Sequence, residues 1–258
     1  MDIQEPEEHL DLRMTLGFIR NDLRAMSDVD LLDTKALEAC KIKVKGLQLS
    51  GKESLPQFFA PCPVDIPGPT DDYVDNHYDP DGDARVSDRA WSLYLYFQSY
   101  LQRMVVDLPP GHDHWCTIAI GDYRFKELRQ LDRSIFGPYW IIRVQEYTRP
   151  HIKCIMFNNV EAADGELLRG EVLTILNLML RQLKLYALVD NMIVPVLIFS
   201  LNGQRPRIIE AYFNGRDLVV KCTKPYDFTA MDSATLKIFA QWFVGEPKGV
   251  TSEFDSGE

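Results

Sequence analysis

The sequence has few cysteines, no long apolar run and no leader-like start, and each absence excludes a class of protein. Its five cysteines are odd in number, widely spaced and never form a CxxC pair, which excludes a disulfide framework and a zinc knuckle. The longest apolar run, near MIVPVLIF at 192–199, is far short of the ~20 residues that span a membrane. The start, MDIQEPEEHLD, lacks the basic and apolar regions of a signal peptide. We therefore expect a protein of the cytoplasm or nucleus without a membrane segment.

Positive charge is also scarce. The chain has 28 Lys and Arg against 38 Asp and Glu, a net charge of −10. Binding to a phosphate backbone needs basic residues gathered on one face, and the longest basic cluster is KIKVK at 41–45. The composition therefore argues against nucleic acid as a partner.

Motifs of nucleophilic and nucleotide chemistry are missing as well. The sequence has no GxSxG elbow, no glycine-rich phosphate loop and no GxGxxG. His151 and Cys154 stand three residues apart in a strand-like run, which places them on opposite faces of a strand. On these grounds we expect a protein that is not an enzyme.

Carboxylates are abundant and cluster in one stretch, DPDGDARVSD at 79–88. Asp79, Asp81 and Asp83 alternate as the first ligands of a calcium loop do. Such a loop also needs glycine at position 6 and glutamate at position 12, whereas glycine here falls at position 4 and alanine at position 12. Two interpretations stay open: a weak, partly hydrated metal site at these three aspartates, or an acidic surface turn, which we favour.

Composition divides the chain into four parts. Residues 1–50 read as a helical N-terminal segment, and residues 51–87 as an acidic, proline-rich loop or linker. A main domain at 88–245 follows, and the polar residues 246–258 are expected to be a disordered tail.

The main domain alternates helical and strand patterns. A helix to about 106 precedes three strands, at 116–120, 139–147 and 151–157, and then a mostly apolar helix at 164–189. A buried strand and a hairpin turning at Asn214-Gly215 come next, with Ala211 expected opposite Leu218. We predict an α+β fold with a predominantly antiparallel or mixed sheet packed against the long central helix.

The order helix, three strands, helix, strand between residues 88 and 200 resembles the core of the restriction-endonuclease-like PD-(D/E)XK family. That family places an Asp on one strand and Glu-x-Lys on the next, and the acids hold a divalent cation. Lys153 stands where the family lysine would, in His-Ile-Lys, with histidine in place of glutamate. The resemblance implies Asp122, Glu146 and Lys153 as catalytic residues and Mg²⁺ or Mn²⁺ as cofactor. The missing glutamate leaves two alternatives open, a divergent enzyme and an inactive relative.

Residues 139–245 also resemble a group of proteins from filamentous fungi that have no assigned activity. The similarity rests on RIIEAYFNGRDLVV, on KPYDF and on the Phe/Trp-rich helix that follows. It implies an intracellular protein and transfers no functional residue.

Taken together, the sequence favours a non-catalytic interaction or regulatory protein. The aromatic residues and the acidic loop suit a protein partner with a basic surface. The alternative, from a different class, is a divergent or inactive metal-dependent nuclease of the PD-(D/E)XK type. The two differ in whether Asp122, Glu146 and Lys153 converge on one concave site.

Overall fold

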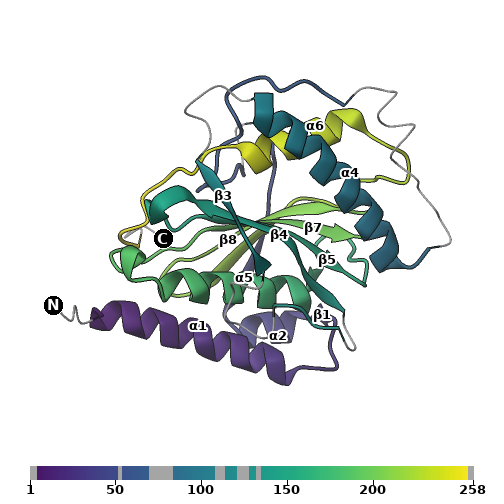
Figure 1. Ribbon diagram of the computed structural model, residues 1–258. Coiled ribbons are helices and arrows are strands. Elements are labelled where there is room, and N and C mark those ends of the chain that lie inside the picture. Colours follow the sequence, from purple (N-terminus) through teal and green to yellow (C-terminus); the bar gives the residue numbers. More distant parts are fainter. Residues whose placement is uncertain are drawn as a thin grey trace.

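The computed structural model describes residues 5–51, 54–69, 84–107, 114–120, 128–131 and 135–254. Its centre is a mixed seven-stranded sheet in the order β2-β9-β8-β7-β5-β4-β3 (Figure 1). The strands are β2 (Ile42–Gly46), β3 (Trp115–Ile118), β4 (Phe136–Val144), β5 (Ile152–Asn158), β7 (Val196–Asn202), β8 (Arg207–Phe213) and β9 (Leu218–Cys222). Two neighbouring pairs are parallel, β2 with β9 and β5 with β7, and the others are antiparallel. The predicted α+β class with a mixed sheet is confirmed.

Helices cover both faces of this sheet. Helix α5 (Arg169–Leu183) lies on one face and α1 (Glu7–Ala25) packs on its outer side, while α4 (Val86–Asp107) and α6 (Ser233–Val244) cover the other face (Figure 1). The short helix α2 (Thr34–Ala39) lies beside β2. Two apolar cores result, one on each side of the sheet.

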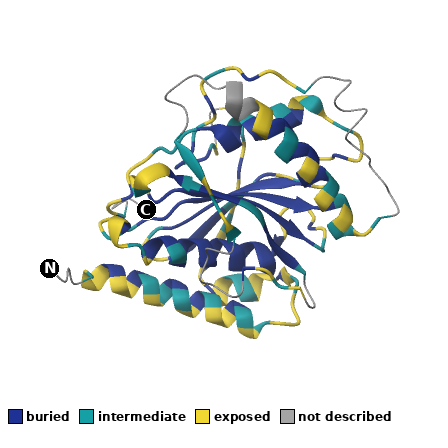
Figure 2. Ribbon diagram, in the orientation of Figure 1, coloured by how far each residue is buried: buried dark blue, intermediate teal, exposed yellow. Residues whose placement is uncertain are grey.

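Helix α5 is buried along almost its whole length, because it has the sheet on one side and α1 on the other (Figure 2). Its apolar composition predicted this coverage. The helix starts later than the predicted residue 164, since Leu167–Leu168 form a short strand, β6, antiparallel to β1 (Leu31–Leu32). Leu167 and Leu168, which the helical pattern placed in the first turn of the predicted helix, therefore form a strand instead.

The hairpin β8–β9 turns at Asn214-Gly215 as predicted, but with a different register. Ala211 pairs with Val220 rather than Leu218, because the loop contains four residues instead of two. The side-chain oxygen of Asn214 accepts hydrogen bonds from the backbone N–H groups of Arg216 and Asp217, which closes the wider turn. A shift of two residues keeps every side chain on its predicted face.

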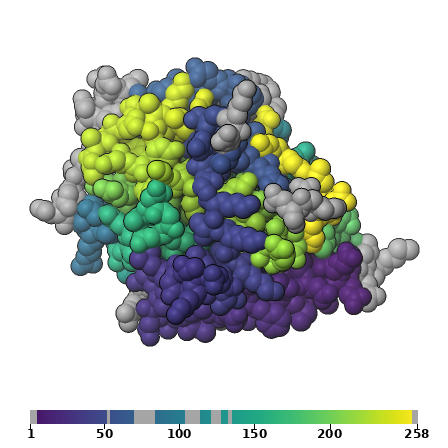
Figure 3. All heavy atoms as spheres, turned by 180° about the vertical axis from the view of Figure 1, so that it is seen from behind, coloured from purple at the N-terminus to yellow at the C-terminus, as the bar shows by residue number. Residues whose placement is uncertain are grey.

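The N-terminal segment is part of the same sheet, which differs from the predicted division at residues 50 and 88. Strand β2 extends the sheet by pairing in parallel with β9 over five residues. From behind, the chain after α2 runs upward between residues of the C-terminal third (Figure 3).

The described part of the predicted linker and of the predicted tail also packs on the core. Phe58 and Phe59 are buried, and Phe59 forms a β-bridge with Pro247. The carbonyl of Thr251 accepts two backbone hydrogen bonds, from Met192 and Ile193. Aromatic and backbone contacts therefore order segments whose composition predicted loops. No helix in the described part of the chain is long and apolar enough to cross a membrane.

Candidate functional site

The predicted catalytic residues lie in different environments. Asp122 falls outside the described residues, as do Asp79, Asp81 and Asp83 of the candidate metal loop. Glu146 is exposed in the 3-10 turn η2 (Gln145–Tyr147), with a positive φ of 53°. Lys153 has no exposed surface on the central strand β5. The structure does not bring Glu146 and Lys153 together.

The ammonium group of Lys153 caps the carboxyl end of helix α6. Its Nζ donates to the backbone carbonyls of Trp242 at 2.9 Å, Phe243 at 2.9 Å and Gly245 at 2.7 Å. The same Nζ lies 4.0 Å from the ring centroid of Trp115. Three donors therefore meet three acceptors at the negative end of the helix dipole, which is the arrangement that makes a buried ammonium tolerable.

Burial also controls the chemistry of the residues beside Lys153. It lowers the pKa of Lys153 well below its ordinary value, and it lowers the pKa of His151 to about 4. It raises the pKa of the Cys154 thiol. Cys154 packs in the core on the α5 side, whereas the His151 ring contacts Phe59 on the other side. His151 and Cys154 therefore lie apart as neutral structural groups, and no thiolate-imidazolium pair forms.

The described residues do not fit the Mg²⁺ or Mn²⁺ site that the nuclease resemblance implies. Hard cations of this kind need oxygen ligands that converge. Glu146 points into solvent, and the Lys153 ammonium is occupied by carbonyls that cap a helix. Within the described ranges, no three His, Cys, Asp or Glu side chains group closely enough to hold a metal ion. No chemical step through a metal is assigned to this chain.

A buried ion pair, missed by the sequence analysis, joins helix α5 to the sheet. Both oxygens of Glu171 accept from the guanidinium of Arg207, Oε1 at 2.9 Å from Nε and Oε2 at 2.5 Å from Nη2. Oε2 also accepts from the backbone N–H of Leu168 at 3.0 Å. Desolvation alone would lower the pKa of Arg207, but the attraction of Glu171 outweighs it and the pKa is raised. The signal in the sequence is the presence of charged residues, Arg207 and Glu210, among the apolar residues of strand β8.

Three polar side chains meet near the carboxyl ends of the parallel strands β5 and β7. The amide of Asn158 donates to Ser200 at 3.0 Å and to Asn202 at 2.9 Å, and all three residues are buried. The Nδ2 of Asn202 has no hydrogen-bond partner. This cluster opens into none of the described pockets, so its clearest role is to fix the ends of the two strands.

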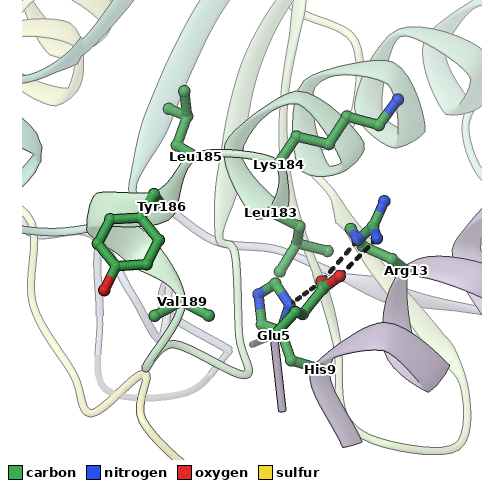
Figure 4. Close-up of a pocket in the computed structure, with 8 residues that line it drawn as sticks. All are labelled: Glu5, His9, Arg13, Leu183, Lys184, Leu185, Tyr186 and Val189. Carbon is green, nitrogen blue, oxygen red and sulfur yellow. Dashed lines mark hydrogen bonds and ion pairs between the residues drawn. The ribbon is translucent and has the colours of Figure 1, made fainter. Parts of the chain in front are cut away.

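A small pocket lies between the start of α1 and the 3-10 turn η3 (Tyr186–Leu188) (Figure 4). Glu5 accepts two hydrogen bonds from Arg13, at 2.8 and 2.6 Å, and lies 2.6 Å from Nδ1 of His9. These bonds to Arg13, with a smaller contribution from His9, lower the pKa of Glu5 to about 2. The volume, about 210 Å³, is below the range of typical ligand pockets. The network therefore anchors the first turn of α1.

The solvent-facing side of α1 carries an apolar stripe that the fold does not use. Leu10, Met14 and Phe18 recur at intervals of four residues and are 39%, 50% and 62% exposed. We call this surface the α1 outer face; its exposed charged residues are all acidic, namely Glu7, Glu8, Asp11 and Asp22. The opposite side of the helix, with Leu16 and Leu23, is buried against α5. The α1 outer face therefore combines exposed apolar side chains with exposed carboxylates, while the arginines of α1 are only partly exposed.

Comparison of the chain with protein-family models, with curated proteins and with solved structures finds no match.

Proposed function

We propose that this protein is a non-catalytic interaction module and that the α1 outer face binds its partner. The observation that carries the proposal is the exposure of Phe18, an aromatic residue that is 62% accessible at the C-terminal end of an apolar stripe. Single exposed apolar residues are common, but three in register on one helix face are typical of a docking surface.

Charge indicates what kind of partner this surface suits. The exposed carboxylates of Glu7, Glu8 and Asp11 flank Leu10 and Met14, and Asp22 lies beyond Phe18. An apolar centre with an acidic rim is complementary to an amphipathic segment that carries Lys or Arg beside its apolar residues. The proposed partner is therefore a protein with a basic amphipathic helix, which agrees with the net charge of −10.

A labelled amphipathic peptide of leucine and lysine, about four helical turns long, serves as the probe. We expect it to bind the intact protein in a fluorescence anisotropy titration, more weakly as salt is raised. The double variant Met14→Ser/Phe18→Ser should weaken binding about tenfold or more, since buried apolar anchors supply most of the affinity at such surfaces. Its melting temperature should stay close to that of the parent, because both side chains are exposed.

The matched control is Leu95→Ser/Leu131→Ser, which removes two exposed leucines outside α1. This variant should bind the peptide as the parent does. Equal affinity of the peptide for both double variants would contradict the proposal. The peptide would then bind nonspecifically to exposed apolar residues and not to the α1 outer face. Light scattering on the free protein tests the competing occupant, a second copy of the chain.

A second proposal has its own observation: the fold is an inactive relative of the PD-(D/E)XK core. Supporting it is the element order α4, β3, β4, β5, α5, β7, with the first three strands antiparallel and β7 parallel to β5. The Lys153 ammonium donates its hydrogen bonds to carbonyls at the end of α6, which supports the view that this relative has no nuclease activity.

A plasmid-nicking assay with Mn²⁺ tests this second proposal. We expect no product above that of a buffer blank, because the Lys153 ammonium is unavailable to an attacking water or a phosphate. Cleavage that depends on Mn²⁺ and disappears in the Glu146→Ala variant would overturn it and restore the active-nuclease interpretation.

A further inference from the structure

Arginine side chains gather around one pocket of this acidic protein. The pocket has a volume of about 310 Å³ and lies where the end of α1, the start of α5 and residues 128–131 meet. Three of its described lining residues are arginines, Arg24, Arg129 and Arg169, and none of them is acidic. The volume falls at the lower end of the range for small-molecule sites.

Two of these arginines are held in place mainly by neutral oxygens. Arg129 donates from Nε and Nη2 to the carbonyl of Pro138, at 3.2 and 3.0 Å. Arg169 donates from Nε to the carbonyl of Val29 at 2.8 Å, and Nη2 lies 3.4 Å from the side-chain oxygen of Gln130. Asp30 is the carboxylate whose charge acts on Arg169. Carbonyl oxygens orient a guanidinium without neutralising it.

The third arginine, Arg24, lines the pocket from the end of α1. Burial lowers the pKa of Arg24, and the like charge of Arg20 lowers it further. Three arginines thus line one pocket of a chain that is acidic as a whole. An anion in the pocket would relieve this repulsion.

A buried polar group independently supports a ligand site here. Asn177, on helix α5, lines the pocket and is 99% buried, and its side-chain oxygen has no hydrogen-bond partner. A buried amide without a partner is costly unless something else supplies the hydrogen bond. A ligand with hydroxyl groups beside its charge would satisfy this amide.

We infer that this pocket binds the phosphate group of a small phosphorylated molecule, held by Arg24, Arg129 and Arg169. Guanidinium groups match the tetrahedral oxygens of phosphate with paired hydrogen bonds, and three arginines line this pocket. Phe136 and Leu173 supply an apolar wall for the group that carries the phosphate. The site is separate from the α1 outer face and does not depend on the proposed function.

Calorimetric titration with phenyl phosphate at constant ionic strength tests the assignment on the full chain. We expect saturable binding, with benzoate, a carboxylate of similar shape, binding more weakly. Arg24→Gln and Arg129→Gln should each weaken phenyl phosphate binding about tenfold, the value of one charge-assisted hydrogen bond. The matched control Arg216→Gln, an exposed arginine in the β8–β9 turn and outside the pocket lining, should change binding less than about twofold.

Several outcomes would overturn the inference. One is the absence of saturable binding to the parent protein, and another is equal binding by the Arg24→Gln and parent proteins. A third is tighter binding of a single-stranded oligonucleotide than of phenyl phosphate at equal phosphate concentration, which would assign the pocket to nucleic acid. Melting temperatures of all variants show whether a loss of binding reflects a loss of fold.

Discussion

Replacing Lys153 by methionine is expected to lower the free energy of unfolding by about 3 kcal/mol or more at neutral pH. Methionine fills much of the same space but donates no hydrogen bond, so the carbonyls of Trp242 and Phe243 lose the Lys153 donor. The carbonyl of Gly245 also loses Lys153 but keeps the indole N–H of Trp115 at 2.7 Å. Each buried acceptor left unpaired costs roughly 1–3 kcal/mol. Urea unfolding measures the change. The exposed lysine at 224 supplies the control, since Lys224→Met should alter stability by less than about 0.5 kcal/mol.

The same variant gives a prediction for pH. Burial lowers the pKa of Lys153 in the folded protein, so the unfolded chain holds this proton to a higher pH than the folded one. Between the two pKa values the unfolded state binds more protons, and stability therefore rises with pH. The stability difference between the parent and Lys153→Met should grow as the pH rises towards about 10, near the ordinary pKa of lysine. A constant or shrinking difference would contradict a buried, desolvated ammonium.

Breaking the Glu171–Arg207 pair should have an effect of similar size. Arg207→Met leaves a carboxylate in the core without its partner, and the removal of one member of a buried pair costs about 3–5 kcal/mol. Glu171→Leu leaves the guanidinium in the same position, with one further contact, from Arg207 Nη1 to the carbonyl of Glu166 at 2.6 Å.

The double variant Glu171→Leu/Arg207→Met separates charge pairing from packing. We expect it to be more stable than either single variant, because it buries no unpaired charge. A double-mutant cycle in urea measures the coupling energy. If the effects of the two single variants simply add, the pair does not interact as its geometry indicates.

Local patterns predicted much of this fold because they report on contacts near in sequence. The apolar density of residues 172–183 predicted a covered helix, and Asn214-Gly215 predicted a hairpin, although the turn is two residues longer. The burial of Lys153 could not be predicted from local patterns. Lys153 stands between Ile152 and Cys154 like any alternating strand residue, and its burial depends on α6, about 90 residues further along the chain.

The candidate surfaces show the same limit. The exposed stripe on α1 follows from its helical spacing, but deciding which apolar face is buried requires knowing that α5 packs against the other side. The arginine pocket combines residues 24, 129 and 169 from three separated segments. No local motif contains them, so sequence reasoning had no signal for the pocket.

The parallel pairing of β2 with β9 has a consequence for how the chain folds as it is made. Ile42 and its partner Leu218 lie 176 residues apart. At the usual ribosomal rates of about 5–20 residues per second, β9 is synthesised roughly 10 to 35 s after β2, and β2 has no strand to pair with during that time. For part of that time the inner side of α1 also lacks α5. The nascent chain therefore exposes an apolar helix face and an unpaired strand together, which is the form of the protein that a chaperone would bind.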